Sequence, residues 1–129
     1  MADNMPKHGT FCWNELVTRD TGAAGKFYSQ LLGWKLNDSG MPGMNYTMFK
    51  VDGMEQSAGG MVAMPAQVPK EVPSHWMAYI TVDDIDATCA KVKELGGQVL
   101  VGPMPVPNMG RFITVLDPTG AAVSFFQFE

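Results

Sequence analysis

The mostly apolar residues 11–18 predict a strand, and the alternation along residues 76–82 predicts another. A stretch with the 3.6-residue spacing of a helix follows each strand, at residues 21–32 and 85–95. A glycine directly follows each of these stretches, as is common at the C-terminal end of a helix. The two halves of the chain therefore begin in the same way, with a strand and then a helix.

Three short stretches rich in β-branched and aromatic residues follow each predicted helix and predict further strands. They are residues 34–36, 46–51 and 60–64 in the first half, and residues 99–101, 112–116 and 123–128 in the second. Each half is thus predicted as strand, helix, strand, strand, strand. Between the halves, the three prolines of residues 65–73 favour an extended linker.

The halves also match in sequence when one is shifted by 63 residues. The identical pairs are Trp13 and Trp76, Thr18 and Thr81, Asp20 and Asp83, Ala24 and Ala87, Leu32 and Leu95, and Gly33 and Gly96. Composition alone would give roughly one or two identities over so short a stretch. We therefore predict one α+β domain over residues 1–129, built from two tandem βαβββ modules at about residues 9–64 and 74–129. One helix per module covers only one sheet face, so we expect a cupped mixed sheet with the helices outside.

The composition, with 46% hydrophobic and 17% charged residues, is that of a globular protein. The net charge of −4 and the scattered basic residues argue against a nucleic-acid partner. No apolar run approaches the ~20 residues of a membrane span, and the N-terminus lacks the apolar region of a secretory signal. We therefore expect a cytoplasmic protein with no membrane partner. Cys12 and Cys89 lack the short spacing of a zinc motif and are predicted to be free thiols.

The run DTGAAGKFYSQLLGW, residues 20–34, resembles the "D, then FY, then LGW" signature of the vicinal oxygen chelate superfamily. Further matching pieces in the second half are residues 82–87, 95–97, 110–111 and 117–120. That superfamily includes glyoxalase I, extradiol dioxygenases and bleomycin resistance proteins. The resemblance covers nearly the whole chain and implies paired modules, a cupped sheet and a homodimer. If the chain is an enzyme, the resemblance implies a glyoxalase-like or dioxygenase-like lyase or oxidoreductase.

Enzymes of that superfamily hold a divalent metal in the cup, and the resemblance implies four ligand positions here. These are Trp13, the stretch at residues 58–60, Met77 and Ser124. An indole has no lone pair to offer a metal, and a thioether is a poor ligand for hard or borderline cations. We therefore predict no cofactor and no metal site of the family's geometry. A divalent metal held by Glu15 and His75 is the fallback, although a catalytic zinc normally takes three protein ligands.

Two titratable residues are candidates for catalysis. Glu15 lies within an apolar strand, where a carboxylate facing the cup would have a raised pKa and suit a general base. The alternatives for Glu15 are an ion pair with Arg111 or Lys50, or a position at the rim of the cup in water. His75 is a candidate proton shuttle or substrate donor, or else a half-exposed imidazole at the start of a strand. His8 lies in a polar N-terminal segment that we expect to be disordered.

Strand alternation predicts an apolar and aromatic lining for the cup. Its predicted members are Trp13, Met77, Tyr79, Phe112, Ser124 and Phe126, joined by Arg111, whose planar fork suits either a substrate carboxylate or a neighbouring acidic side chain. The Pro-rich residues 103–109 are expected to form a semi-rigid loop, either a lid over the cup or a plain connection.

Such a lining is typical of a site for an organic ligand, although the same side chains would also fill a closed core. The preferred function is binding of a small apolar or aromatic molecule without the family metal. The alternative is a metal-dependent lyase, isomerase or dioxygenase with relocated ligands.

Overall fold

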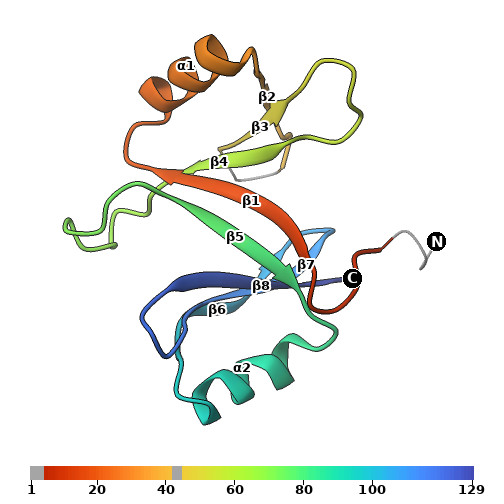
Figure 1. Ribbon diagram of the computed structural model, residues 1–129, viewed down its shortest axis with the longest axis vertical. Helices are drawn as coiled ribbons and strands as arrows, with labels where there is room; N and C mark the ends of the chain where they lie inside the picture. The colour runs from red at the N-terminus through yellow and green to blue at the C-terminus, as the bar shows by residue number, and fades with distance from the viewer. Residues whose placement is uncertain (1–4, 42–44) are drawn as a thin grey trace. The chain divides into compact units, whose positions relative to one another are not determined.

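The structure, a computed structural model, describes residues 5–41 and 45–129. Its elements follow one another as β1 (Phe11–Thr18), α1 (Thr21–Leu32), β2 (Lys35–Asp38), β3 (Tyr46–Lys50), β4 (Gly59–Ala63), β5 (His75–Thr81), α2 (Ile85–Glu94), β6 (Gln98–Val106), β7 (Gly110–Leu116) and β8 (Ala122–Phe128) (Figure 1). The order βαβββ occurs twice, and the strands pair in a mixture of parallel and antiparallel ladders. The predicted α+β class and the two tandem modules are confirmed.

The chain divides into two compact units. The first unit is Asn14–Trp76, and the second joins the segment that ends at Trp13 to Met77–Glu129. The Pro-rich stretch at residues 65–73 therefore belongs to the first unit, and β1 contributes residues to both units. No helix in the part of the chain that the structure describes is long and apolar enough to cross a membrane.

In the first unit the strand order is β2-β3-β4-β1, with β1 parallel to β4 and the other pairs antiparallel. Helix α1 packs on one face of these strands. The buried residues Leu16, Phe49 and Met61 form the core there, with Ala24, Tyr28 and Trp34 packed against them. The Asp20 carboxylate starts the helix by accepting a hydrogen bond from the Ala23 N–H at 2.9 Å.

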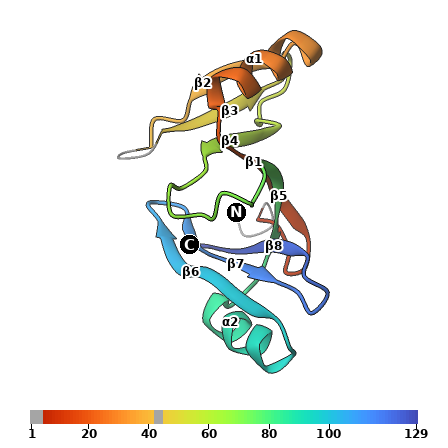
Figure 2. The same cartoon turned by 90° about the vertical axis from the view of Figure 1, so that its left-hand side faces the viewer.

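In the second unit the order is β5-β8-β7-β6, with β5 parallel to β8. Figure 2 shows α2 lying along strands of its own unit. The core between α2 and these strands contains the buried residues Val82, Ile85, Ile113 and Val115. Each helix thus covers one face of its own module's sheet, and the other face of that sheet is not covered by the helix.

The structural repeat has a spacing of 64 residues, one more than the spacing at which the letters match. Asp20 and Asp84 are the N-caps of their helices. Because side chains alternate between sheet faces, a slip of one residue moves a side chain to the other face. Trp76, which the letters align with Trp13, accordingly packs on the α1 side, with its ring centroid 5.4 Å from that of Tyr28.

The extended linker predicted at residues 65–73 is wrong, because the segment folds into two turns. Val68 N–H donates to Pro65 O at 3.1 Å, and Val72 N–H donates to Pro69 O at 3.0 Å. The Arg19 guanidinium holds the second turn by donating to Pro69 O at 2.8 Å and to Val72 O at 2.9 Å. A single arginine therefore satisfies carbonyls that an extended segment would leave to water.

The loop expected at residues 103–109, with its two alternatives of a lid and a plain connection, is also wrong for most of this stretch, because residues 103–106 belong to strand β6. Strand β6 continues to Val106 and pairs with Gly110 of β7, which leaves only a tight turn in which Met109 N–H donates to Val106 O at 3.0 Å. Prolines 103 and 105 are tolerated because β6 is the last strand of its unit's sheet, and an edge strand can spare backbone donors.

Candidate ligand-binding site

One face of the second unit's sheet, opposite α2, carries most of its aromatic side chains. The register places Tyr79 beside Ser124 and Phe126 beside Phe112, and residues in register on neighbouring strands point to the same side. Met104 of β6 is in register with Phe112. We define this aromatic face by Met77, Tyr79, Met104, Phe112, Phe126 and Phe128. The structure thus brings five predicted site residues onto one face, namely Met77, Tyr79, Phe112, Ser124 and Phe126.

The rings of the aromatic face are tilted against one another. The ring centroid of Tyr79 lies 6.1 Å from that of Phe112 and 6.4 Å from that of Phe126, and Phe126 lies 4.7 Å from Phe128. Tilted pairs at these separations are a favoured arrangement of aromatic rings. Tyr79 and Phe126 are buried, whereas Phe112 and Phe128 are half-buried.

Hydroxyl groups lie among these rings. The Thr114 and Ser124 side-chain oxygens are 2.7 Å apart, and Ser124 is fully buried. Thr81, in register with Phe126, has a buried hydroxyl oxygen with no hydrogen-bond partner among the described residues. An unpaired buried hydroxyl costs free energy, so a ligand or a water that supplied the missing hydrogen bond would be held there.

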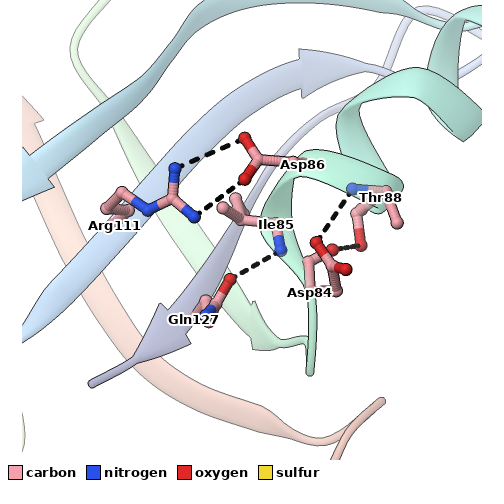
Figure 3. A network of polar contacts seen from close by, with 7 residues as sticks. Asp84, Ile85, Asp86, Thr88, Arg111 and Gln127 are labelled. Atoms are coloured by element: carbon pink, nitrogen blue, oxygen red, sulfur yellow. Dashed lines mark hydrogen bonds and ion pairs between the residues drawn. The ribbon is translucent and has the colours of Figure 1, made fainter.

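Arg111 does not belong to the aromatic face. It precedes Phe112 in β7 and so points to the α2 side, where its guanidinium donates to both carboxylate oxygens of Asp86 at 3.0 and 3.3 Å (Figure 3). This hydrogen bond to Asp86 raises the pKa of Arg111. Its register partner Gln127 accepts a hydrogen bond from Ile85 N–H at 2.8 Å. Of the two predicted roles, the structure shows the contact with a neighbouring acidic side chain.

Glu15 lies on the face of the first unit's sheet opposite α1, since its neighbour Leu16 packs toward α1. It is half-buried and in register with Gly60 of β4. A Cβ at Gly60 would collide with the ring and hydroxyl of Tyr46, so the buried Tyr46 side chain covers Gly60 beside Glu15. The place of Tyr46 could not be predicted from the sequence, because a glycine does not indicate which side chain packs over it.

The two cations considered as partners of Glu15 have other contacts. Arg111 binds Asp86, and the Lys50 ammonium donates to Met54 O at 3.2 Å and to Glu55 O at 2.8 Å. Trp13, on the same face of β1 as Glu15 by strand alternation, is half-buried.

His75 lines an open hollow of about 400 Å³ on the α1 side of the first unit, together with Asp20, Tyr28 and Trp76. Glu15 is not among the residues that line this hollow. The His75 Nδ1 lies 2.8 Å from Pro73 O. A carbonyl only accepts, so Nδ1 is the donor, and Nε2 of the neutral ring is left as an acceptor. The hollow lies in the first unit, whereas the predicted aromatic lining lies in the second.

The expectation that His8 lies in a disordered segment is wrong. Its Nδ1 accepts a hydrogen bond from Asp83 N–H at 3.0 Å, and the backbone beside it pairs with the end of β5 through Gly9 N–H and Thr81 O at 2.8 Å. The free cysteines are as predicted.

The donor set does not fit the divalent metal of the family. The structure puts Gly60 in register with Glu15, and Ser124 in register with Tyr79, so each closing strand offers a glycine or a hydroxyl that already has a partner. Within residues 5–41 and 45–129, no three His, Cys, Asp or Glu side chains gather as a metal site would need.

The chain is similar to known proteins along almost its whole length. It is 39% identical over 130 residues to "Putative glyoxylase CFP32" of Mycobacterium tuberculosis, a match over 95% of this chain and 49% of that protein. It is 32% identical over 129 residues to the anthracycline biosynthesis protein DnrV of Streptomyces peucetius, over 92% of this chain and 47% of that protein. The chain thus spans about half the length of these curated relatives.

Among solved structures, methylmalonyl-CoA epimerase from Mycobacterium tuberculosis aligns with a TM-score of 0.60 at 17% identity, over 100% of this chain and 96% of that chain. At this identity the likeness shows the fold alone. Residues 10–125 match the profile of the family described as Glyoxalase/Bleomycin resistance protein/Dioxygenase superfamily. With its two βαβββ modules and this match, the chain belongs to the glyoxalase/bleomycin resistance/dioxygenase superfamily, the vicinal oxygen chelate proteins.

Proposed function

We propose that the chain binds a small apolar or aromatic molecule on the aromatic face of the second unit, without the metal of the family's enzymes. The observation that carries this proposal is the register of the strands, which places the rings of Tyr79, Phe112 and Phe126 on one sheet face, away from α2. Sites for organic ligands are mostly apolar and aromatic, with a few polar groups that fix orientation. The hydroxyls of Thr81 and Thr114 are such groups.

The favoured ligand class is a planar aromatic compound that carries hydroxyl or carbonyl groups. Its rings would stack on or against the tilted rings of Phe112 and Phe126, and its polar groups would pair with the Thr81 hydroxyl. The name of the relative DnrV, an anthracycline biosynthesis protein, supports a polycyclic aromatic class.

A matched pair of substitutions tests the site. Phe125 and Phe126 are neighbours in β8 that point to opposite faces, Phe125 toward α2 and Phe126 onto the aromatic face. We expect Phe126→Leu to weaken binding of an anthracycline about three- to tenfold, since an aromatic pair contributes roughly 0.5–1.5 kcal/mol beyond its buried area. Phe125→Leu should lower stability and leave the affinity unchanged. Fluorescence titration with the anthracycline measures the affinity of both variants.

Failure of the wild-type protein to bind any planar aromatic in a saturable way would end the proposal, and so would equal losses in both variants. Elemental analysis of the purified protein addresses the alternative. The proposal would be wrong if the protein held one equivalent of tightly bound divalent metal and each of Glu15→Gln and His75→Gln lost it. The function would then be that of a metal-dependent lyase, isomerase or dioxygenase.

A further inference from the structure

Three aromatic rings meet at nearly right angles on the α1 side of the first unit. The Tyr28 ring is edge to face with Phe27, with ring centroids 5.0 Å apart and ring planes at 86°. It meets Trp76 in the same way, at 5.4 Å and 79°. All three side chains line the hollow of about 400 Å³, whose lining residues all belong to the first unit. The rings therefore form an open corner, and several rings around one space are what binds ammonium groups in aromatic cages.

The corner is held in shape by contacts within the protein. The Trp76 indole N–H donates to the Tyr28 hydroxyl at 3.1 Å, and the Tyr28 ring stacks on Trp34 with centroids 5.7 Å apart. Phe27 and Trp76 are nevertheless 57% and 43% exposed, so their rings remain open to a ligand. A site that is already ordered spends little of its binding free energy on fixing side chains.

The hollow carries a negative charge. Among the described residues that line it, Asp20 alone is an Asp, Glu, Lys or Arg. Its carboxylate accepts a hydrogen bond from the Ala23 N–H at 2.9 Å, at the start of α1. A helix N-terminus carries only roughly half a positive charge, so the carboxylate leaves a net negative charge there. The preceding Arg19 does not line the hollow, and its guanidinium donates to the carbonyls of Pro69 and Val72.

We propose that this hollow binds a small organic ammonium ion. Its methylated head would lie against the rings of Phe27, Tyr28 and Trp76, with its charge balanced by Asp20. A cation is attracted to the face of an aromatic ring, most strongly to that of tryptophan, and methyl groups on the nitrogen add apolar contact. A hydroxyl or N–H group on the stem of the ligand would donate to His75 Nε2, since Nδ1 donates to Pro73 O.

The size of the hollow suits a free small molecule, because sites for such ligands are typically about 300–1,000 Å³. The hollow shares no residue with the aromatic face, which lies in the second unit. This inference therefore goes beyond the proposed function, and its test does not depend on whether an aromatic compound binds there.

The probe is choline, a trimethylammonium ion with a short hydroxyl-bearing stem. Its control is the uncharged analogue in which a carbon atom replaces the nitrogen, because the two have the same shape. Calorimetric titration at constant ionic strength should show saturable binding of choline, at least about tenfold tighter than that of the analogue. In NMR spectra of the complex, the signal of the Trp76 indole N–H should shift, whereas that of Trp13 in the other unit should not.

Two exposed phenylalanines provide a matched pair of variants. Phe27 is 57% exposed and lines the hollow, whereas Phe11 is 69% exposed and does not line it. We expect Phe27→Leu to weaken choline binding about two- to fivefold, since it removes one ring and keeps an apolar side chain. Phe11→Leu should leave the affinity unchanged.

The two helix N-caps provide a second pair. Asparagine caps a helix about as well as aspartate, so Asp20→Asn and Asp84→Asn should both remain folded. Asp20→Asn should lower the affinity for choline and leave that for the uncharged analogue unchanged. Asp84→Asn should change neither affinity.

Four results would overturn the proposal. They are an absence of saturable choline binding, equal affinities for choline and its uncharged analogue, equal losses in the variants of either pair, and binding of a trimethyllysine peptide without binding of choline. In the last case the ligand would be a protein segment and not a small molecule.

Discussion

The hydroxyls of Thr114 and Ser124 share a hydrogen bond of 2.7 Å across β7 and β8, in register and with Ser124 fully buried. Ser124 is the position at which the resemblance implies a metal ligand. Its oxygen is occupied by another side chain, so the pair stabilises the sheet beneath the aromatic rings.

Ser124→Ala should destabilise the protein by about 1–3 kcal/mol, because it leaves the Thr114 hydroxyl unpaired in a buried place. The double variant Ser124→Ala with Thr114→Val should recover much of this loss, since both partners are then apolar. Urea unfolding of the wild type, Ser124→Ala, Thr114→Val and the double variant gives the coupling free energy. Strictly additive effects would show that the hydroxyls are not coupled.

Gly60→Ala should destabilise the first unit by about 1–3 kcal/mol, because the new methyl group would meet the ring of Tyr46. Tyr46→Leu in the same chain should relieve part of that loss. Gly22→Ala in α1 is a suitable control, since its Cβ would make only an ordinary contact, 3.6 Å from the Asp20 carboxylate, and alanine favours a helix. Thermal or urea unfolding measures the stability of the wild type, of Gly60→Ala, of Gly22→Ala, and of Gly60→Ala combined with Tyr46→Leu. Equal losses for Gly60→Ala with and without Tyr46→Leu would contradict the close approach.

If Glu15 serves function, Glu15→Gln should leave the protein folded while it weakens ligand binding or turnover. The substitution keeps the shape of the side chain and removes its charge. It strands neither Arg111 nor Lys50, since Arg111 binds Asp86 and Lys50 binds the carbonyls of Met54 and Glu55. Lower stability with unchanged affinity would instead assign Glu15 a structural role.

Asp117 makes the stability of the protein depend on pH. The Thr119 hydroxyl, followed by the Ala121 and Thr119 N–H groups, lowers the pKa of Asp117 below its usual value. A lowered pKa in the folded state stabilises the fold above the unfolded-state pKa of about 3.9, and this contribution is lost as the pH falls through the folded-state pKa. Asp117→Asn should therefore be less stable than the wild type at pH 7, and the difference should shrink as the pH falls below about 3.9.

Urea unfolding at several pH values measures this difference. Thr119→Val supplies the control, because it removes the largest cause of the shift and should move the loss of stability toward higher pH. A constant difference between Asp117→Asn and the wild type from pH 7 to pH 2 would contradict the assignment.

The elements of this fold could be predicted from the sequence because their signals are local. Helical spacing and the strand patterns identified both modules, and the structure shows Asp20 and Asp84 as the N-caps of the two helices. The letters match at a spacing of 63 residues partly because α2 is shorter than α1, so the glycines after the helices, Gly33 and Gly96, lie 63 apart while the N-caps lie 64 apart. Alternation within each strand still placed Tyr79 and Phe126 on one face.

Other features depend on contacts between residues far apart in the chain, and no local pattern announces them. Arg19 reaches carbonyls about 50 positions later, and Tyr46 covers Gly60 only because of the register between β3 and β4. Arg111 was predicted to bind the ligand because a guanidinium can bind the carboxylate of a ligand as well as that of a neighbouring side chain. The register of β7 in the structure shows that the Arg111 side chain points to the sheet face opposite that of Phe112.

The bonds of Arg19 also bear on how the chain folds as it leaves the ribosome. Its partners Pro69, Val72 and Ser74, like the partner of Trp76, all lie within Asn14–Trp76. The first unit can therefore close once Trp76 has emerged, whereas residues 9–13 must wait for β5 and the strands after it. Synthesis in this direction would leave residues 9–13 to find their native partners after the residues that follow them.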